Sequence, residues 1–245
     1  MSLQDKVILI TGATKGIGRA IAERVVSEGA IVVANYNSDK KAADEMTQKL
    51  GADHCLTVQA DASNLADIDK LVDAAVSRFG RIDVCIANAG LLHMVDLMST
   101  TEADFDRSYA INVKGPYFLA QKVVPHMKPG SRIIFVSTTL NHHSGVTPNY
   151  CLYSSTKGAI EQITRVSAKG LAAKGILVNC VAPGPTATEL FLRGKSEQLI
   201  ERIASANPFN RLGQPEEIAS VFAFLCGPDS SWVTGQVIRT NGGMA

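Results

Sequence analysis

Seven short apolar runs recur along the chain, each six or seven residues long and rich in β-branched side chains. They cover residues 6–11, 30–35, 54–60, 82–88, 131–137, 176–182 and 235–240. Apolar residues follow one another in these runs instead of alternating with polar ones, which is typical of strands buried on both faces. The pattern therefore predicts seven strands of a covered, parallel sheet.

Segments with helical spacing of apolar residues separate the runs. They cover Gly16–Ser27, Ser38–Leu50, Asn64–Phe79, Thr100–Met127 (long enough for two helices), Cys151–Ala173 and Pro215–Cys226. The regular alternation predicts one α/β domain over residues 1–245, with a doubly wound parallel sheet and helices on both faces. Residues 186–210 interrupt the rhythm, and we expect this insertion to form a lid at the edge of a cleft.

Composition narrows the class of partner. The chain has 245 residues, 46% hydrophobic, and 24 Lys and Arg against 23 Asp and Glu give a formal net charge of +1. Without a block of like charge, we expect neither nucleic acid nor membrane as a partner, but a small molecule. The five scattered cysteines form no CxxC pair, so we expect no metal site and a reducing, cytoplasmic compartment. The apolar run after "MSLQDK" is too short for a signal peptide.

A glycine-rich loop follows the first predicted strand. In "TGATKGIG", Gly12, Gly16 and Gly18 directly precede a helix. Glycines there let the backbone approach a pyrophosphate, whose charge then lies at the positive end of the helix. The same glycines could serve packing alone, but their place in the first strand–helix unit predicts dinucleotide binding.

A tyrosine and a lysine stand four residues apart in the segment predicted as helix 151–173. Tyr153 and Lys157 should therefore share one helix face. A neighbouring ammonium favours the phenolate, so we expect Lys157 to lower the pKa of Tyr153 and make it a general acid and base. Tyr150 lies seven residues from Lys157, where coupling is weaker, and we expect it to shape the pocket.

Motifs along nearly the whole chain resemble those of the short-chain dehydrogenase/reductase family. They are "TGATKGIG", Asp61, "ANAG" at 87–90, Asn112 in "INVKG", the Tyr153/Lys157 pair, "PGPTAT" at 183–188 and the closing "VTGQVIRTNGG". The closest pattern is that of 3-oxoacyl-[acyl-carrier-protein] reductase-like members. The resemblance implies a Rossmann-type fold and a homotetramer or dimer, in which helices such as 151–173 pair across a two-fold axis.

The resemblance also implies which residues hold the cofactor. Lys157 would reach the nicotinamide ribose, and Asn112 would hold a water that links Lys157 to solvent. Without that role, Asn112 is a polar residue that interrupts a helix. The full set of cofactor-binding candidates is Gly12, Thr14, Lys15, Gly16, Ile17, Gly18, Asn35, Tyr36, Asn37, Ser38, Asp61, Ala62, Asn88, Ala89, Gly90, Val136, Tyr153, Lys157, Pro183, Gly184, Thr186 and Thr188.

Charge at the end of the second strand favours NADP(H) over NAD(H). "VVANYNS" carries no acidic residue that would repel a 2′-phosphate, and Lys40 and Lys41 follow soon after. Lys15 in the glycine loop adds a cation, as in NADP-preferring members of the resembling family. Asp39 argues the other way, but we expect it to begin the next helix, where a negative charge suits the dipole.

A further hydroxyl should hold the carbonyl oxygen of a substrate. The resembling family places a serine thirteen residues before the tyrosine, but Leu140 stands there. Alignment on the strand "RIIFVS" selects Thr138, with Ser137 as the second candidate and Ser144 or His143 as fallbacks. His142 and His143 are either solvated loop residues or part of the pocket rim.

These features predict an NADPH-dependent carbonyl reductase whose catalytic residues are Tyr153, Lys157, Asn112 and Thr138 or Ser137. By resemblance the substrate is a 3-oxoacyl compound, free or carrier-bound, and Lys174 would suit an acidic carrier. A reductase of polyketide, aromatic or other secondary-metabolite ketones fits about as well. A non-redox, cofactor-binding scaffold is the alternative from another class.

Overall fold

The computed structural model describes residues 3–245 and contains one seven-stranded, wholly parallel sheet. The strand order is β3-β2-β1-β4-β5-β6-β7. The strands are β1 Val7–Ile10, β2 Ile31–Tyr36, β3 Cys55–Gln59, β4 Val84–Ala87, β5 Arg132–Val136, β6 Leu177–Pro183 and β7 Val237–Thr240. All seven predicted strands are present, and the doubly wound order confirms the predicted Rossmann-type fold.

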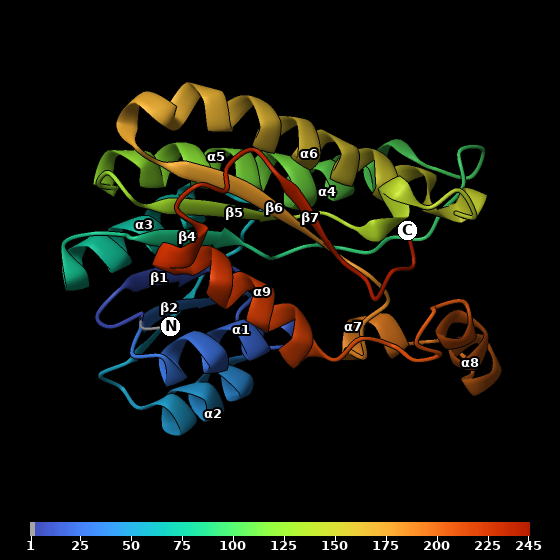
Figure 1. Ribbon diagram of the computed structural model, residues 1–245, viewed down its shortest axis with the longest axis horizontal. Helices are drawn as coiled ribbons and strands as arrows, with labels where there is room; N and C mark the ends of the chain where they lie inside the picture. Colours follow the sequence, from blue (N-terminus) through green and yellow to red (C-terminus); the bar gives the residue numbers. More distant parts are fainter. Residues whose placement is uncertain (1–2) are drawn as a thin grey trace.

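Helices cover both faces of the sheet (Figure 1). α1, α2 and α9 lie on one face, and α3, α4, α5 and α6 lie on the other. The helices are α1 Gly16–Ser27, α2 Lys40–Leu50, α3 Leu65–Phe79, α4 Glu102–Tyr109, α5 Gly115–Val123, α6 Cys151–Leu171, α7 Glu189–Leu192, α8 Glu197–Ser205 and α9 Pro215–Cys226.

The apolar runs are continuous because each strand packs against helices on both sides. In β1, Ile8 and Ile10 join the core cluster that contains α1 and α9 residues, whereas Val7 and Leu9 join the cluster that contains α3 and α6 residues. Side chains alternate across a strand, so a strand covered twice needs an apolar residue at every position. All four are at most 1% exposed.

Polar residues set the helix starts next to the glycine loop. Asp39 caps α2, with its carboxylate accepting a hydrogen bond from the Ala42 N–H at 3.0 Å, which confirms its expected place at a helix start. The helix accordingly begins at Lys40 and not at Ser38. Asn64 caps α3 in the same way. α1 differs, since Lys15 at its N-cap position provides no side-chain cap.

The long segment 100–127 forms two helices joined by a turn of π-helix at Ala110–Lys114. The turn carries Asn112, which is fully buried. Gly115 begins α5 where a Cβ atom would lie only 2.1 Å from the Ala62 carbonyl oxygen. Single π turns inside α-helices are frequent at functional sites.

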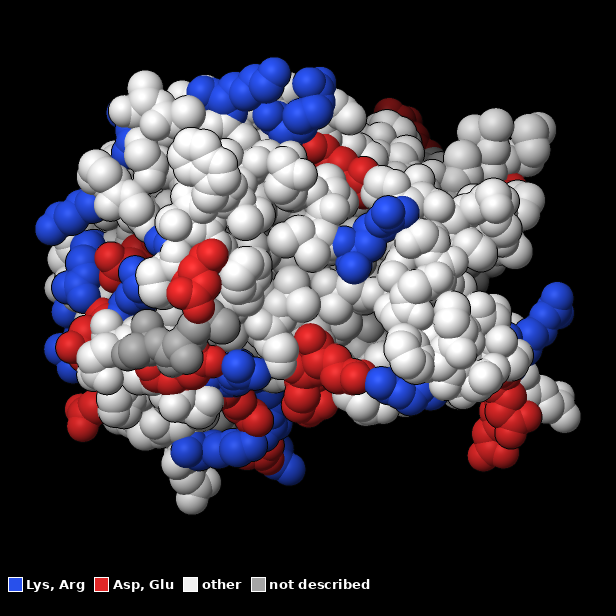
Figure 2. Space-filling view, viewed as in Figure 1, with Lys and Arg blue, Asp and Glu red and all other residues white. Residues whose placement is uncertain are grey.

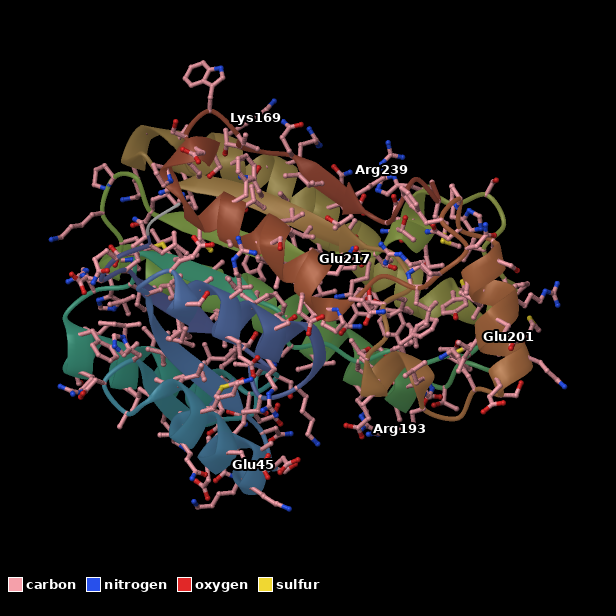
Figure 3. The ribbon with its side chains drawn as sticks, turned by 60° about the horizontal axis from the view of Figure 1, so that its bottom comes forward. Glu45, Lys169, Arg193, Glu201, Glu217 and Arg239 are labelled. Atoms are coloured by element: carbon pink, nitrogen blue, oxygen red, sulfur yellow. The ribbon has the colours of Figure 1, made fainter. Side chains whose placement is uncertain are left out.

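The expected lid segment, residues 186–210, carries the short helices α7 and α8 beyond the end of the sheet (Figure 1). Its two ends are tied together, because the Ala187 N–H donates to the Gly213 carbonyl and the Gly213 N–H donates to the Pro185 carbonyl, both at 2.9 Å. In Figure 3, Arg193 and Glu201 mark this part of the molecule.

Basic and acidic side chains are interspersed on the face shown in Figure 2. Within residues 3–245, no helix has the length and apolarity required to cross a membrane.

Candidate active site

A cavity of about 1070 Å³ runs along the carboxyl edge of the sheet, from the glycine loop to the lid segment. This edge is where doubly wound sheets bind ligands. The cavity brings together most of the predicted site residues. These are Gly12, Lys15, Gly16, Ile17, Gly18, Asn35, Asn37, Asp61, Ala62, Asn88, Ala89, Gly90, Val136, Ser137, Thr138, Tyr153, Lys157, Pro183, Gly184, Thr186 and Thr188. Thr14, Tyr36, Ser38 and Asn112 are not among the lining residues.

The glycine loop leaves the start of α1 open to an anion. Gly12 and Gly16 have positive φ angles of 62° and 52°. At Gly18 a Cβ would lie 2.2 Å from the Gly12 carbonyl oxygen, so the loop closes tightly only without a side chain. The first turn of α1 contains no acidic residue and α1 has no side-chain cap, so its N–H groups remain available for a phosphate.

Two side-chain amides, buried Asn35 and partly buried Asn88, support this loop. Asn35 accepts a hydrogen bond from the Gly12 N–H at 3.2 Å and donates to the Ala60 carbonyl at 2.8 Å. Asn88 donates to the Thr11 carbonyl at 2.9 Å and the Gly12 carbonyl at 3.1 Å. Both amides therefore support the backbone that faces the cavity.

Among the three cations that favoured NADP(H), only Lys15 lines the cavity. Its ammonium lies 2.6 Å from the Asp39 carboxylate and 3.9 Å from that of Glu189, and the hydrogen bond to Asp39 raises the pKa of Lys15. Lys40 and Lys41 pair with acidic residues along α2 itself. Of these three lysines, Lys15 is therefore the one whose position in the cavity suits contact with a 2′-phosphate.

Tyr153 and Lys157 share the face of α6 that lines the cavity, as their spacing predicts. The Lys157 ammonium nitrogen lies 5.8 Å from the centroid of the Tyr153 ring and donates to the Val136 carbonyl at 2.8 Å. Lys157 is 4% exposed. At so buried a position, few polar groups stabilise the charged form of Lys157.

Burial governs the charge of both groups. It raises the pKa of Tyr153 to about 12, although a hydrogen bond with Thr138 acts in the opposite direction. It lowers the pKa of Lys157 to about 8. The predicted lowering of the Tyr153 pKa by Lys157 is therefore wrong for this structure, because burial disfavours the charged phenolate. At pH 7 Tyr153 carries its proton and is ready to act as an acid.

The two candidate hydroxyls at the end of β5 have different partners. The Thr138 side chain interacts with the Tyr153 phenol and acts to lower the pKa of that phenol. The Ser137 hydroxyl donates instead to the Glu161 carboxylate at 2.6 Å and is 2% exposed. Of the two candidates, Thr138 therefore acts on Tyr153, whereas the Ser137 hydroxyl is engaged by Glu161.

The two histidines of the following loop also have different surroundings. His143 lines the cavity, as does Tyr150. His142 lies 3.2 Å from a Glu161 carboxylate oxygen. One histidine thus belongs to the pocket rim and the other to a contact behind it.

Asn112 joins the loop after β4 to the catalytic helix. Its amide oxygen accepts from the Leu91 N–H at 2.8 Å, and its nitrogen donates to the Leu91 carbonyl at 2.9 Å and the Thr156 hydroxyl at 3.1 Å. A Cβ at Gly90 would lie 3.2 Å from the Asn112 amide oxygen and 3.5 Å from the Lys157 nitrogen. Asn112 and Lys157 are therefore close neighbours across Gly90.

Several lining residues lay outside the sequence-based prediction. The lid segment contributes Leu190, Phe191, Leu199 and Ile203, and the loop after β4 adds Leu91, Leu92 and Met94. Only the helical spacing in "SEQLIERIASA" pointed to some of them. Glu161 was missed altogether, since a glutamate inside a helix carries no signal of its partners. Within residues 3–245, no group of three or more His, Cys, Asp or Glu is placed to hold a metal.

Comparison with known proteins agrees with this geometry. Residues 12–245 match the family described as "Enoyl-(Acyl carrier protein) reductase". Elsinochrome reductase 1 of Elsinoe fawcettii is 38% identical over 98% of this chain and 94% of its own length. The hydroxynaphthalene reductase-like protein Arp2 of Metarhizium guizhouense is 35% identical over 99% and 96%. The structure of the angucycline C-6 ketoreductase LanV with bound NADP superposes with a TM-score of 0.91, 35% identity and coverage of 99% and 96%.

The fold and this degree of similarity define an oxidoreductase that acts on carbonyl or alcohol groups. The chain belongs to the short-chain dehydrogenase/reductase family.

Proposed function

We propose that this protein is an NADPH-dependent reductase of aromatic or polyketide-derived ketones. One observation carries the proposal. The cavity joins the uncapped start of α1 to a half-buried, protonated phenol, Tyr153, which interacts with the Thr138 side chain and is flanked by Lys157. A site for a pyrophosphate and a proton donor thus share one cavity.

The residues present fit a bound dinucleotide. The open N–H groups of α1 suit its pyrophosphate, and Lys15 suits a 2′-phosphate. When bound, NADPH supplies a hydride to the carbonyl carbon. Thr138 orients the carbonyl oxygen by a hydrogen bond, Tyr153 donates the proton to that oxygen, and Lys157 places a positive charge beside the phenol as it loses the proton.

The cavity walls favour an aromatic ketone over a carrier-bound 3-oxoacyl chain. Leucine, isoleucine, phenylalanine and methionine side chains from the lid segment and the loop after β4 line the cavity. Lys174, the cation suggested for carrier docking, lies at the other end of α6, about 30 Å along the helix axis from Tyr153. The proposal is supported by the names of three similar proteins, an elsinochrome reductase, a hydroxynaphthalene reductase-like protein and an angucycline C-6 ketoreductase.

A substrate panel tests the proposal. Purified protein is mixed with NADPH and, separately, with bicyclic aromatic ketones, quinones and 3-oxoacyl thioesters, and loss of NADPH absorbance is followed. We expect turnover with the aromatic ketones and slower turnover with the thioesters. Preference for the thioesters would restore the 3-oxoacyl assignment. Binding of NADPH without turnover across the panel would favour a scaffold protein.

Replacing Lys15 by alanine should weaken NADPH binding selectively. Loss of a charged hydrogen bond to the 2′-phosphate removes about 1.5–3 kcal/mol, or roughly a 10- to 100-fold rise in Kd. NADH lacks that phosphate, so its Kd should change little. Titration of both nucleotides measures the difference, with Lys41→Ala, a lysine paired within α2, as the matched control. Equal losses for both nucleotides would contradict the role of Lys15.

Replacing Thr138 by valine should lower kcat about 100-fold, since one donor to the developing charge is lost at nearly constant volume. Thr138→Ser should recover most of the rate. Ser137→Ala should cost only a few-fold, because its hydroxyl points to Glu161. Steady-state kinetics of the three variants decide between the two hydroxyls, and the reverse order would exchange their roles.

We further propose a cytoplasmic homotetramer. Exposed apolar side chains support association, among them Phe105 on α4, Tyr117 on α5 and Val166 on α6. Ile160, part of the same apolar stripe of α6, is buried in the core and does not contribute to such a surface.

A further inference from the structure

Glu161 extends the catalytic face of α6 by one further turn. It follows Tyr153 and Lys157 at four-residue intervals, so the three side chains lie along one side of the helix. The Glu161 side chain is only 13% exposed. No salt bridge joins it to a lysine or arginine within the described part of the chain, so its burial depends on hydrogen bonds.

Three donors from one loop meet on a single oxygen of Glu161. The Ser137 hydroxyl donates to Oε1 at 2.6 Å and the Asn141 amide donates at 3.3 Å. His142 Nε2 lies 3.2 Å from the same oxygen and forms an ion pair with it when protonated. Hydrogen bonds to a carboxylate are stronger than those between neutral groups. The loop 137–142 is therefore held against α6 at both of its ends.

Thr138 lies between these attachment points. Its hydroxyl oxygen accepts from the Leu140 N–H at 3.3 Å, and this contact caps the 3₁₀ turn at Thr139–His142. The Thr139 hydroxyl accepts from the Asn241 amide at 2.6 Å, so the loop is also attached to the segment after β7. The loop is thus attached to both Glu161 and Asn241. These attachments determine the direction of the Thr138 hydroxyl toward Tyr153.

We propose that Glu161 is a positioning residue for the reduction. It binds the loop 137–142 through Ser137, Asn141 and His142 and so keeps the Thr138 hydroxyl directed at Tyr153. This inference rests on the proposed function, since it assigns Thr138 to the substrate oxygen. It differs from a purely structural role because its effect on turnover must pass through Thr138.

Kinetics of a double-mutant cycle test the proposal. Glu161→Ala should lower kcat for ketone reduction about 10- to 100-fold, as expected for a misplacement of about 1 Å near the reacting atoms. The Kd for NADPH should stay within twofold. In a Thr138→Val background, Glu161→Ala should lower kcat by less than threefold, because the group that it positions is already absent. Full, additive losses in both backgrounds would overturn the proposal.

Two further variants guard against trivial unfolding. Glu161→Gln keeps an acceptor oxygen and should recover most of the rate, whereas Gln162→Ala, on the exposed face next to it, should behave as wild type. A Gln variant as slow as the Ala variant, with an unchanged melting temperature, would show that the acceptor is not what matters and would count against the proposal.

Amide hydrogen exchange supplies a readout that does not depend on turnover. In Glu161→Ala the amides of residues 139–143 should exchange at least tenfold faster, while those of β5 and the glycine loop should keep their protection. Unchanged exchange in this loop would overturn the positioning role even if no reducible ketone were found. If exchange changed as expected but wild-type protein reduced no ketone, the proposed function alone would fail.

Discussion

Tyr153→Phe is expected to lower kcat for ketone reduction about 1,000-fold, within the range for loss of a positioned general acid. The variant removes one oxygen and leaves the ring in place. Burial raises the pKa of the native phenol to about 12, so this side chain holds a proton throughout the neutral range and lines the same cavity as Thr138. Single-turnover mixing of variant, NADPH and ketone measures the chemical step directly.

Cofactor titration separates this effect from loss of binding. The Kd of the Tyr153→Phe variant for NADPH should stay within about threefold of wild type, since less than 1 kcal/mol is at stake for one neutral contact. Tyr150→Phe is the matched control, because Tyr150 lines the same cavity and loses the same oxygen. If Tyr150→Phe were the slower variant, the proton donor would have to be reassigned to Tyr150.

Lys157→Met is expected to lower kcat by about 100- to 1,000-fold, because the charge that stabilises the developing phenolate is lost. The same lysine should control the pH profile of the wild type. Its pKa lies at about 8, so the ammonium is present below that pH and is lost as the pH rises through it, while Tyr153 remains protonated. Reduction by wild type should therefore decline above pH 8, and the variant should lack this decline.

The same variant should be more stable than wild type at pH 7. Lowering the pKa from 10.5 to about 8 corresponds to a cost of about 3 kcal/mol for keeping the buried lysine charged. Loss of the hydrogen bond to the Val136 carbonyl offsets about 1 kcal/mol of the gain. The net gain of about 2 kcal/mol should raise the Tm by about 4–8 °C.

The direction of the pH effect on stability follows from these pKa values. Below pH 8 Lys157 is charged in both folded and unfolded protein, and the full cost applies. Between pH values of about 8 and 10.5 the folded protein has lost the proton while the unfolded chain keeps it. The free energy of unfolding of the wild type therefore rises with pH in this window. The stability advantage of Lys157→Met should shrink over this window in denaturant titrations. A variant less stable than wild type at pH 7 would contradict the assigned burial cost.

Local patterns along the sequence sufficed to predict the fold. Each strand is buried on both faces, so every position must be apolar, and this makes the seven runs visible without any knowledge of their partners. The glycines at 12, 16 and 18 and the four-residue spacing of Tyr153 and Lys157 are local in the same sense. Backbone geometry within one loop or one helical turn links such residues, so their placement follows from the sequence alone.

Only the tertiary structure could decide between neighbouring side chains. Ser137 and Thr138 are equivalent in the sequence, but Ser137 meets Glu161, which is 24 residues away, whereas Thr138 meets Tyr153. In the sequence Lys40 and Lys41 are as good candidates for a phosphate contact as Lys15. In the structure both form ion pairs with acidic residues of α2. The pKa of Tyr153 also depends on burial by elements remote in the chain, and the predicted direction of its shift was therefore wrong.

The sequence by itself determined which residues form the strands, the glycine loop and the tyrosine–lysine pair, because short-range periodicity encodes them. Charge states and hydroxyl partners depend on solvent exclusion and on contacts between distant segments, which exist only in the folded chain.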